Sequence, residues 1–427
     1  MGCAASSPRP VSSPDRSPKG AKSMIDSQTH VHSKKLQPDI VQDFQKPTGT
    51  NGKQDETVTE GKIPEDSRPS TLVKVPSVVH VRGAGVTHIG YGPLKRENQD
   101  IFCVHEEFAL SQGVTPKGCS LFGVWDGHGT RGRNVSVFCQ QKTPAVLSRL
   151  LSETSAGQLS DASPNAMATI DKEETRQALV AAFTQTDAEV NMSPIDCSLS
   201  GSTASVALVC GPQLFVATAG DSRVVMGTWD AEAKQITAEP LSLDHRPARA
   251  DERKRCLEAG GRVQQRKNST GGPVGSERLW LQDIDSPGLM VTRSIGDAVA
   301  ASVGCTSAPE VVHRILDTQK HKFLVMGSDG LWDVLDNQTV VNIVHQYDDV
   351  GEAAKELLKV AMNKWEQLCS ADNITIVVVR FYAEHAKLPK SWEPPVTIVD
   401  CELTDEEEDE YNSDGTKTPR WAPKGRF

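Results

Sequence analysis

The sequence predicts an α+β fold with antiparallel sheets. Short runs rich in β-branched and aromatic residues recur between residues 79 and 383, and Gly, Asp and Asn separate them. Longer stretches between these runs carry apolar residues at helical spacing. The strands come in clusters and do not alternate strictly with helices, which favours antiparallel sheets over a doubly wound parallel sheet.

Each expected element has its own signal in the chain. Strands are expected where the apolar runs are short, at residues 102–104, 121–125, 205–210, 214–218, 223–228, 323–328 and 374–381. Helices are expected at residues 133–151, 172–190, 250–258, 340–346 and 352–368. The pair Gly260 and Gly261 is a typical helix stop after the third of these. Residues 151–171 are rich in Ser, Ala, Gly, Asp and Pro and are expected to form a surface loop.

The two ends of the chain differ from its middle. Only 37% of the 427 residues are hydrophobic and 5% are aromatic, which is low for a chain that folds throughout. Residues 1–78 are rich in Ser, Pro, Lys and Gln and are expected to be a disordered tether. Residues 384–427 are acidic and then basic, and are expected to be a disordered, solvated tail, with folding back onto a basic site as the alternative. One domain at 79–383 then carries the function.

Composition also excludes several classes of protein. The formal net charge of −10 disfavours a nucleic-acid binder. The ten Cys are scattered without a CxxC pair, so we expect reduced thiols, as in a cytoplasmic protein, and no thiolate zinc site. No apolar run approaches the roughly 18 residues of a spanning helix, and we expect no secretory signal because the first residues are followed by Pro, Ser and Lys. We expect a monomer.

The first residues match a lipidation pattern. Gly2, exposed after removal of Met1, and Ser6 fit N-myristoylation, and Cys3 is placed to accept a palmitoyl chain. One myristoyl chain holds a membrane weakly, so the second signal matters physically. The pattern predicts a protein on the cytoplasmic face of a membrane, with the plasma membrane expected, and in the cytoplasm. The alternative is a chance Met-Gly start.

The distinctive feature is a set of Asp residues at strand ends, each beside Gly or another turn residue. They are Asp100, Asp126, Asp221, Asp297, Asp329 and Asp372. Neighbouring buried carboxylates raise one another's pKa and are costly unless a cation compensates them. Oxygen ligands without a Cys or His cluster indicate Mg²⁺ or Mn²⁺. Two such ions would activate a water for phosphoester hydrolysis, and His128 is placed to act as the general acid.

Each of these Asp motifs, and His128, has a simpler explanation when it is considered alone. An Asp-Gly pair is a common turn, and a lone histidine is more often structural. A turn, however, does not need the same strand-Asp-Gly signature repeated along most of a domain.

Taken together, residues 79–383 resemble the metal-dependent type 2C protein Ser/Thr phosphatases, the PPM-type phosphatases. The motifs are Glu-Asn-Gln-Asp at 97–100, Asp-Gly-His-Gly at 126–129, Gly-Ser-Thr at 201–203, Gly-Asp-Ser-Arg at 220–223, Leu-Asp-His-Arg-Pro at 243–247, Ser-Ile-Gly-Asp at 294–297, Ser-Asp-Gly-Leu-Trp-Asp at 328–333 and Asp-Asn at 372–373. The resemblance implies two antiparallel sheets packed as a sandwich and flanked by helix pairs. It also implies hydrolysis of phosphoserine and phosphothreonine in proteins with two Mg²⁺ or Mn²⁺ ions.

The resemblance also implies roles for individual residues. Asp126 would bridge the two metals, Asp329 and Asp372 would complete one site, and the Gly127 carbonyl and Asp100 would support the other. The positions that would assist a third, weaker metal are Thr203, Asp221 and Asp333. His128 falls on the family's proton donor, whereas Asp297 and Arg293 fall in a motif that we interpret as mainly structural.

Two positions depart from the family pattern. The phosphate-binding Arg aligns with Lys95, with Arg96 one position away, and a lysine lacks the bidentate fork of a guanidinium. A Glu found in many members is Gln99, which can order a metal-bound water but supplies no charge.

The variable flap of this family corresponds to residues 243–284. Its basic residues are Arg246, Arg249, Arg253, Lys254, Arg255, Arg262, Arg266 and Lys267. They would favour acidic or multiply phosphorylated substrates if they face the site, and the alternative is a solvated polar helix.

Two other functions compete with the phosphatase. One is a catalytically silent, membrane-anchored scaffold of the same fold that binds phosphoproteins. The other is a metal-dependent hydrolase of small phosphoesters, which the absence of a Walker-type loop disfavours.

Overall fold

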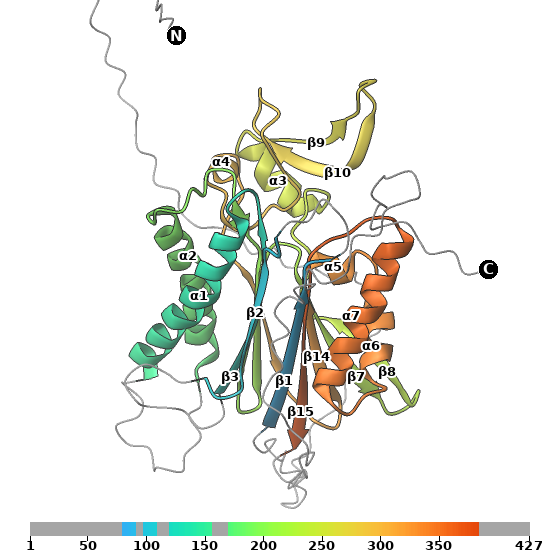
Figure 1. The fold of residues 1–427 in the computed structure, drawn as a ribbon. Helices are drawn as coiled ribbons and strands as arrows, with labels where there is room; N and C mark the ends of the chain where they lie inside the picture. The colour runs from blue at the N-terminus through green and yellow to red at the C-terminus, as the bar shows by residue number, and fades with distance from the viewer. Residues whose placement is uncertain (1–78, 91–96, 109–118, 156–169, 384–427) are drawn as a thin grey trace, which may run out of the picture. The chain divides into compact units, whose positions relative to one another are not determined.

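The computed structural model describes residues 79–90, 97–108, 119–155 and 170–383. These residues form two antiparallel sheets packed face to face, with a pair of helices against each outer face (Figure 1). The predicted α+β sandwich is therefore confirmed. Within the described ranges, no helix is both long enough and apolar enough to cross a membrane.

The first sheet joins the two ends of the described chain. Its strands, in spatial order, are β1 (Val79–His88), β15 (Ile374–Ala383), β14 (His321–Gly327), β7 (Arg223–Asp230) and β8 (Gln235–Pro240). β1 and β15 pair along their full length, from Val79 opposite Ala383 to His88 opposite Ile374. The last strand is thus held between the first strand and β14.

The second sheet has β3 near its centre. Its order is β12 (Ile295–Gly296), β4 (Gly201–Ser202), β3 (Cys119–His128), β5 (Ala204–Cys210), β6 (Gln213–Ala219) and β13 (Glu310–Ile315), and β2 (Asp100–His105) pairs with β3. All seven strands predicted from the sequence fall in these two sheets, although Ser328 lies just beyond β14.

Alternation along the strands separates the layers of the core. Phe122 and Val124 of β3 pack between the two sheets, whereas Leu121 and Trp125 pack toward the helices. Successive side chains of a strand point to opposite faces, so one buried strand serves two apolar layers. Full burial of such side chains stabilises the fold by about 1.5–3 kcal/mol each.

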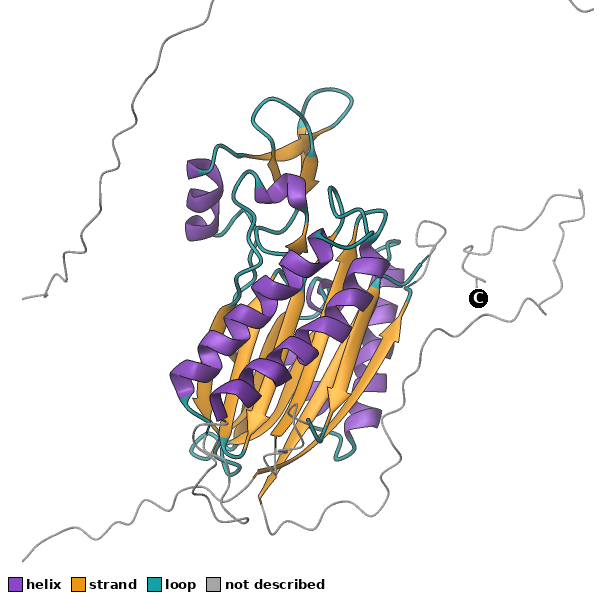
Figure 2. Cartoon of the chain, turned by 90° about the vertical axis from the view of Figure 1, so that its left-hand side faces the viewer, coloured by secondary structure: helices purple, strands orange, loops and turns teal. Residues whose placement is uncertain are grey.

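The helix pairs are α1 (Gly132–Ser155) with α2 (Lys172–Asn191) and α6 (Asn337–Val344) with α7 (Val350–Gln367). Figure 2 shows α1 and α2 lying across the strands of the sandwich. The five helices expected from the sequence are present. α6 begins three residues earlier than expected because the Asp336 side chain accepts from the Thr339 backbone N–H and caps its first turn.

The flap is a separate small layer. It contains α3 (Ala250–Glu258), β9 (Arg262–Lys267) and β10 (Pro273–Trp280), near α4 (Ala298–Ala301). A third strand, β11 (Pro287–Leu289), pairs with β10 from just beyond the predicted end of the flap at residue 284. Cys256, Leu279 and Cys305 form part of its apolar core. The flap strands were not expected, because most side chains of β9 and of the first half of β10 are exposed and show no apolar alternation.

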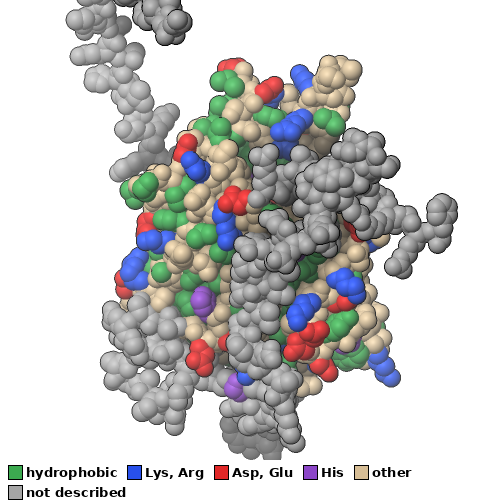
Figure 3. Space-filling model, viewed as in Figure 1, with side chains coloured by type: hydrophobic (Ala, Val, Ile, Leu, Met, Phe, Trp, Pro, Cys, Tyr) green, Lys and Arg blue, Asp and Glu red, His purple; other side chains and the backbone are tan. Residues whose placement is uncertain are grey.

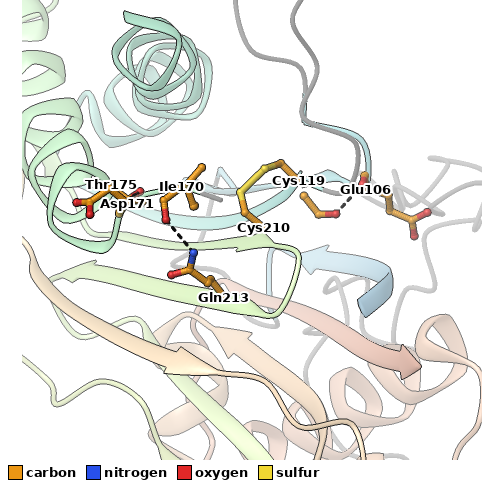
Figure 4. Close-up of a disulfide and its surroundings, with 8 residues drawn as sticks. Glu106, Cys119, Ile170, Asp171, Thr175, Cys210 and Gln213 are labelled. Atoms are coloured by element: carbon orange, nitrogen blue, oxygen red, sulfur yellow. Dashed lines mark hydrogen bonds between the residues drawn. A yellow bond between two sulfur atoms is a disulfide. The ribbon is translucent and has the colours of Figure 1, made fainter. Parts of the chain in front are cut away.

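One expectation about the cysteines is wrong. Cys119 and Cys210 are opposite each other in the β3–β5 register, with Cα atoms 4.2 Å apart, and they form a disulfide (Figure 4). The two residues are 91 positions apart in sequence, so only the sheet register brings them together. The remaining cysteines of the described part are free, and all of these except Cys369 are buried.

Some predicted segments lie outside the described residues. These are the tether at 1–78, the tail at 384–427 and residues 156–169 of the expected loop. The start of that loop is helical instead, because α1 continues to Ser155.

Candidate metal centre

Asp100 and Asp126 face each other across two neighbouring strands. The β2–β3 register places them directly opposite. The backbone of Asp100 is fixed, since its N–H donates to Asn98 Oδ1 (3.1 Å) and its carbonyl accepts from Arg133 Nη1 (2.6 Å). Its side chain is fully buried, and neither carboxylate oxygen has a hydrogen-bond partner among the described residues. Buried carboxylate oxygens without partners are costly, so this arrangement favours the binding of a cation.

Further carboxylates join this pair from other strands. Asp329 is the first residue of α5 (Asp329–Trp332), directly after β14, Asp221 follows β6, and Asp372 precedes β15. Burial and the charges of Asp100, Asp329, Asp221 and Asp372 raise the pKa of Asp126 well above its usual value. We call Asp100, Asp126, Asp329 and Asp372 the strand-end cluster.

Burial and mutual repulsion raise the pKa values of several carboxylates in this cluster. Burial raises the pKa of Asp100 to about 6; the nearby Ser328 and Thr375 hydroxyls offset part of this rise, and the charge of Asp372 adds to it. Burial, with the charges of Asp221, Asp372 and other neighbours, raises the pKa of Asp329 strongly. Within the described ranges, no Lys or Arg forms an ion pair with Asp100, Asp126 or Asp329.

Gly127 lets the end of β3 approach the loop before α1. Its N–H donates to the Gln99 carbonyl (3.2 Å). A Cβ at this position would lie 2.3 Å from the Gly132 oxygen and 2.7 Å from the Gln99 oxygen, so no side chain fits. The close packing therefore fixes the backbone of Gly127 next to Asp126. The family resemblance implies that the carbonyl of Gly127 is a metal ligand.

These residues fit a pair of divalent cations. The cluster supplies only oxygen ligands, it is buried, and it carries more negative charge than its described neighbours balance. Hard cations such as Mg²⁺ and Mn²⁺ prefer oxygen donors of this kind. Asp126, Asp329 and Asp372 would hold one ion, and Asp126, Asp100 and the Gly127 carbonyl would support the other.

Asn373 connects three segments around the cluster, a role that the sequence did not reveal. Its Oδ1 accepts from the Gln99 N–H (3.0 Å), and its Nδ2 donates to the Ile89 carbonyl (2.9 Å). The Gln99 side chain donates to the Gly129 carbonyl (2.9 Å). Gln99 therefore helps to hold the loop that follows Asp126. The Asp-Asn pair was visible in the sequence, but its contacts were not.

His128 has a buried partner that changes our interpretation of one motif. Its Nε2 donates to Asp297 Oδ2 at 2.6 Å, and that oxygen also accepts from the Ser294 hydroxyl at 2.6 Å. Burial opposes protonation of His128, but the charge and hydrogen bond of Asp297 raise its pKa overall. Asp297, expected to be mainly structural, thus positions the candidate general acid.

The residues expected to assist a third metal already have partners. The Thr203 hydroxyl accepts from the Asp126 N–H (3.1 Å) and bonds with the Ser222 hydroxyl (2.7 Å). Arg246 Nε donates to Asp221 Oδ2 (2.9 Å), and its Nη2 donates to Asp333 Oδ1 (2.8 Å). A guanidinium therefore lies between these two carboxylates.

Four residues of the predicted site set lie outside the described residues. They are the candidate phosphate-binding residues Lys95 and Arg96 and the candidate lipidation residues Gly2 and Cys3.

A second group of potential ligands contains His245, Glu252 and Glu310. The fully buried Glu252 carboxylate accepts from Arg255, Arg293 and the Thr292 hydroxyl. Arg249 donates to Glu310 through two nitrogens. These guanidinium groups already neutralise both carboxylates, so this group, which we call the flap-base cluster, does not fit a divalent cation.

The basic flap is largely neutralised within the protein. Arg253 pairs with Glu277 at 2.7 Å, Arg255 with Glu252 at 2.6 Å and Arg262 with Asp285 at 2.5 Å. On the face drawn in Figure 3, basic and acidic side chains lie close together among the described residues. The solvated alternative is therefore better supported for these residues than an anion-binding surface.

Known proteins resemble this chain over most of its described part. The family model for protein phosphatase 2C matches residues 96–367. The probable protein phosphatase 2C 48 of Oryza sativa subsp. japonica is 34% identical over 275 residues, which cover 63% of this chain and 75% of the relative. The probable protein phosphatase 2C 35 of Arabidopsis thaliana is 32% identical over 338 residues, which cover 74% of this chain and 88% of the relative.

The chain belongs to the protein phosphatase 2C family. The fold agrees as well. The serine-threonine phosphatase 2C of Toxoplasma gondii superposes with a TM-score of 0.59 at 23% identity, covering 72% of this chain and 98% of that structure. Family membership makes this chain a protein Ser/Thr phosphatase.

Proposed function

We propose that this type 2C phosphatase hydrolyses phosphoserine and phosphothreonine in proteins with two Mg²⁺ or Mn²⁺ ions in the strand-end cluster. The observation that carries the proposal is the buried Asp100 carboxylate, which has no described hydrogen-bond partner and lies opposite Asp126. Bound there, the ions would lower the pKa of a water and stabilise the charge that develops on the phosphoryl oxygens.

The chain's own residues would supply the remaining steps. His128, held through Nε2 by Asp297, delivers a proton from Nδ1 to the departing Ser or Thr oxygen. Lys95 and Arg96 are proposed to orient the phosphate. Thr203 and Gly127 keep the backbone of Asp126 in place. No nucleophilic side chain is needed, so the reaction is a single displacement by water.

The direct test is hydrolysis of a phosphothreonine peptide by the full chain in EDTA, Mg²⁺ or Mn²⁺. Asp126→Ala and Asp329→Ala are compared with Asp285→Ala, whose carboxylate is exposed and pairs with Arg262. Metal-dependent turnover that is lost only in the first two variants supports the proposal. A folded wild-type chain without turnover in any metal would favour the non-catalytic scaffold instead.

We also propose attachment to the cytoplasmic face of a membrane through myristate on Gly2 and palmitate on Cys3. The support is the Met-Gly-Cys start with Ser6 at the favoured position. Two lipid chains give stable anchoring, whereas one gives reversible binding. Metabolic labelling with alkyne fatty acids and membrane fractionation would compare the full chain with Gly2→Ala and Cys3→Ser. Label that persists in Gly2→Ala would contradict the myristate.

A further inference from the structure

We propose that Arg246 is a built-in cation that occupies the Asp221–Asp333 position, so that a third divalent ion binds there only after Arg246 leaves. This inference rests on the proposed function, because it concerns which cation these two carboxylates hold beside the catalytic ions. It assigns to one flap residue the control of how many metal ions the phosphatase carries.

The contacts of Arg246 are those of a bridging cation. Its Nε lies 2.9 Å from Asp221 Oδ2, and its Nη2 lies 2.8 Å from Asp333 Oδ1. The two carboxylates come from different parts of the second half of the fold, one after β6 and the other at the C-terminal end of α5. Two nitrogens of one planar group thus join two acidic segments, which a lysine ammonium cannot do with the same geometry.

The charges around Arg246 favour this pairing. Asp221 is buried, and its side chain is only 4% exposed, so it needs a counter-charge. The neighbouring Asp244 already has one, since Arg223 binds both of its oxygens at 2.9 and 2.7 Å. Arg246 Nε also lies 3.9 Å from Asp244 Oδ2. Its short hydrogen bonds go to Asp221 and Asp333, so its guanidinium lies between these two carboxylates.

The segment that carries Arg246 is held in place on its N-terminal side. The N–H of His245 donates to the Gly220 carbonyl (2.9 Å), and the His245 ring is fully buried. Asp244 is fixed by Arg223. The backbone that leads to Arg246 is therefore anchored next to Asp221, so little order is lost when the bridge forms.

The test counts bound ions directly. Full-length protein is titrated with Mn²⁺, and free Mn²⁺ is measured by electron paramagnetic resonance, for the wild type, Arg246→Gln and Arg246→Lys. Arg253→Gln is the matched control, because this flap arginine pairs with Glu277 away from the Asp221–Asp333 position. We expect two tight ions in all four proteins, and a third ion that binds at least about tenfold tighter in Arg246→Gln than in the wild type.

Two further results separate the possible outcomes. The gain should disappear in Arg246→Gln combined with Asp221→Asn, and Arg246→Lys should lie between the wild type and Arg246→Gln. The inference is overturned if folded Arg246→Gln binds the third ion with unchanged affinity and shows only a lower melting temperature. Arg246 would then stabilise the fold without controlling metal binding. If Arg246→Gln does not fold, an unchanged third step in Arg246→Lys overturns the inference equally. Loss of the two tight ions in the wild type would instead overturn the proposed function.

Discussion

The strand-end cluster and the flap-base cluster are both acidic and largely buried, yet their carboxylates are compensated in different ways. Glu252 and Glu310 are surrounded by Arg249, Arg255 and Arg293. Asp100 and Asp126 face each other with no guanidinium between them in the described part of the chain. Arginine makes one cluster a permanent part of the fold, and its absence leaves the other open to an exchangeable ion.

The largest expected effect is a loss of activity on substitution in the strand-end cluster. Asp126→Asn should lower kcat for a phosphothreonine peptide by roughly a thousandfold, because in the proposed centre both ions would depend on this carboxylate. In EDTA the same variant should be at least as stable as the wild type, since it removes repulsion from Asp100 and Asp329. Peptide turnover measures the change in kcat, and urea unfolding in EDTA measures the change in stability. A marked loss of stability in EDTA would place Asp126 in the same category as Glu252.

The second prediction concerns the flap-base cluster, where a substitution should lower stability. Glu252→Ala should lower the free energy of unfolding by about 3–5 kcal/mol, because it leaves Arg255 and Arg293 without their buried partner. Asp251→Ala is the control. Its side chain is 61% exposed, and loss of its ion pair with Arg249 should cost at most about 1 kcal/mol. Urea unfolding in EDTA measures both, and equal costs would remove the distinction between the clusters.

Divalent ions should stabilise only through the strand-end cluster. At one hundred times the dissociation constant, Mn²⁺ should add about 2.7 kcal/mol to the unfolding free energy of the wild type. Asp251→Ala should keep this increment, and Asp126→Asn should lose most of it. Thermal unfolding with and without Mn²⁺ provides the measurement. An increment that survives in Asp126→Asn would mean that the ions bind elsewhere.

The clusters should also respond oppositely to pH in the metal-free protein. The pKa of Glu252 is lowered by Arg255 and Arg293 against the opposing effect of burial, so its stabilisation is complete above the usual 4.5 and is lost as pH falls below it. The pKa of Asp100 is raised by burial from 3.8 to about 6, so the wild type should lose stability as pH rises through this interval.

Asp100→Asn should remove that loss, a difference of about 1–3 kcal/mol between the two proteins at neutral pH. Urea unfolding in EDTA at a series of pH values from 4 to 7 compares the wild type with Asp100→Asn. Parallel curves across the range would contradict the assignment of the change to Asp100.

The smallest expected effect concerns Asp297, a buried carboxylate whose partner is a histidine. Asp297→Asn should lower kcat about tenfold and shift the arm of the pH profile assigned to His128 to lower pH, because the carboxylate raises the pKa of that histidine. The number of Mn²⁺ ions bound should not change. A fall in kcat with an unmoved pH profile would indicate a purely structural role.

Sequence patterns predicted much of this molecule where the signal is local. Strands such as β3 and β5 were visible because their apolar runs serve two buried layers, and the candidate metal ligands were visible because each Asp lies at or near one end of an apolar run. The flap strands β9 and β10 were not, since their exposed polar side chains carry no period. The Cys119–Cys210 bond, the Asp297 contact to His128 and the Arg246 bridge depend on register and on loops that meet in space.

The position of β15 has a consequence for how the protein is made. Asp372 and Asn373 come directly before β15, near the end of the described chain, and β15 must insert between β1 and β14 to bring them to Asp100 and Asp126. A nascent chain on the ribosome therefore carries the early candidate ligands for most of synthesis without the late ones. The proposed metal centre would be complete only after the final strand has emerged and the first sheet has closed.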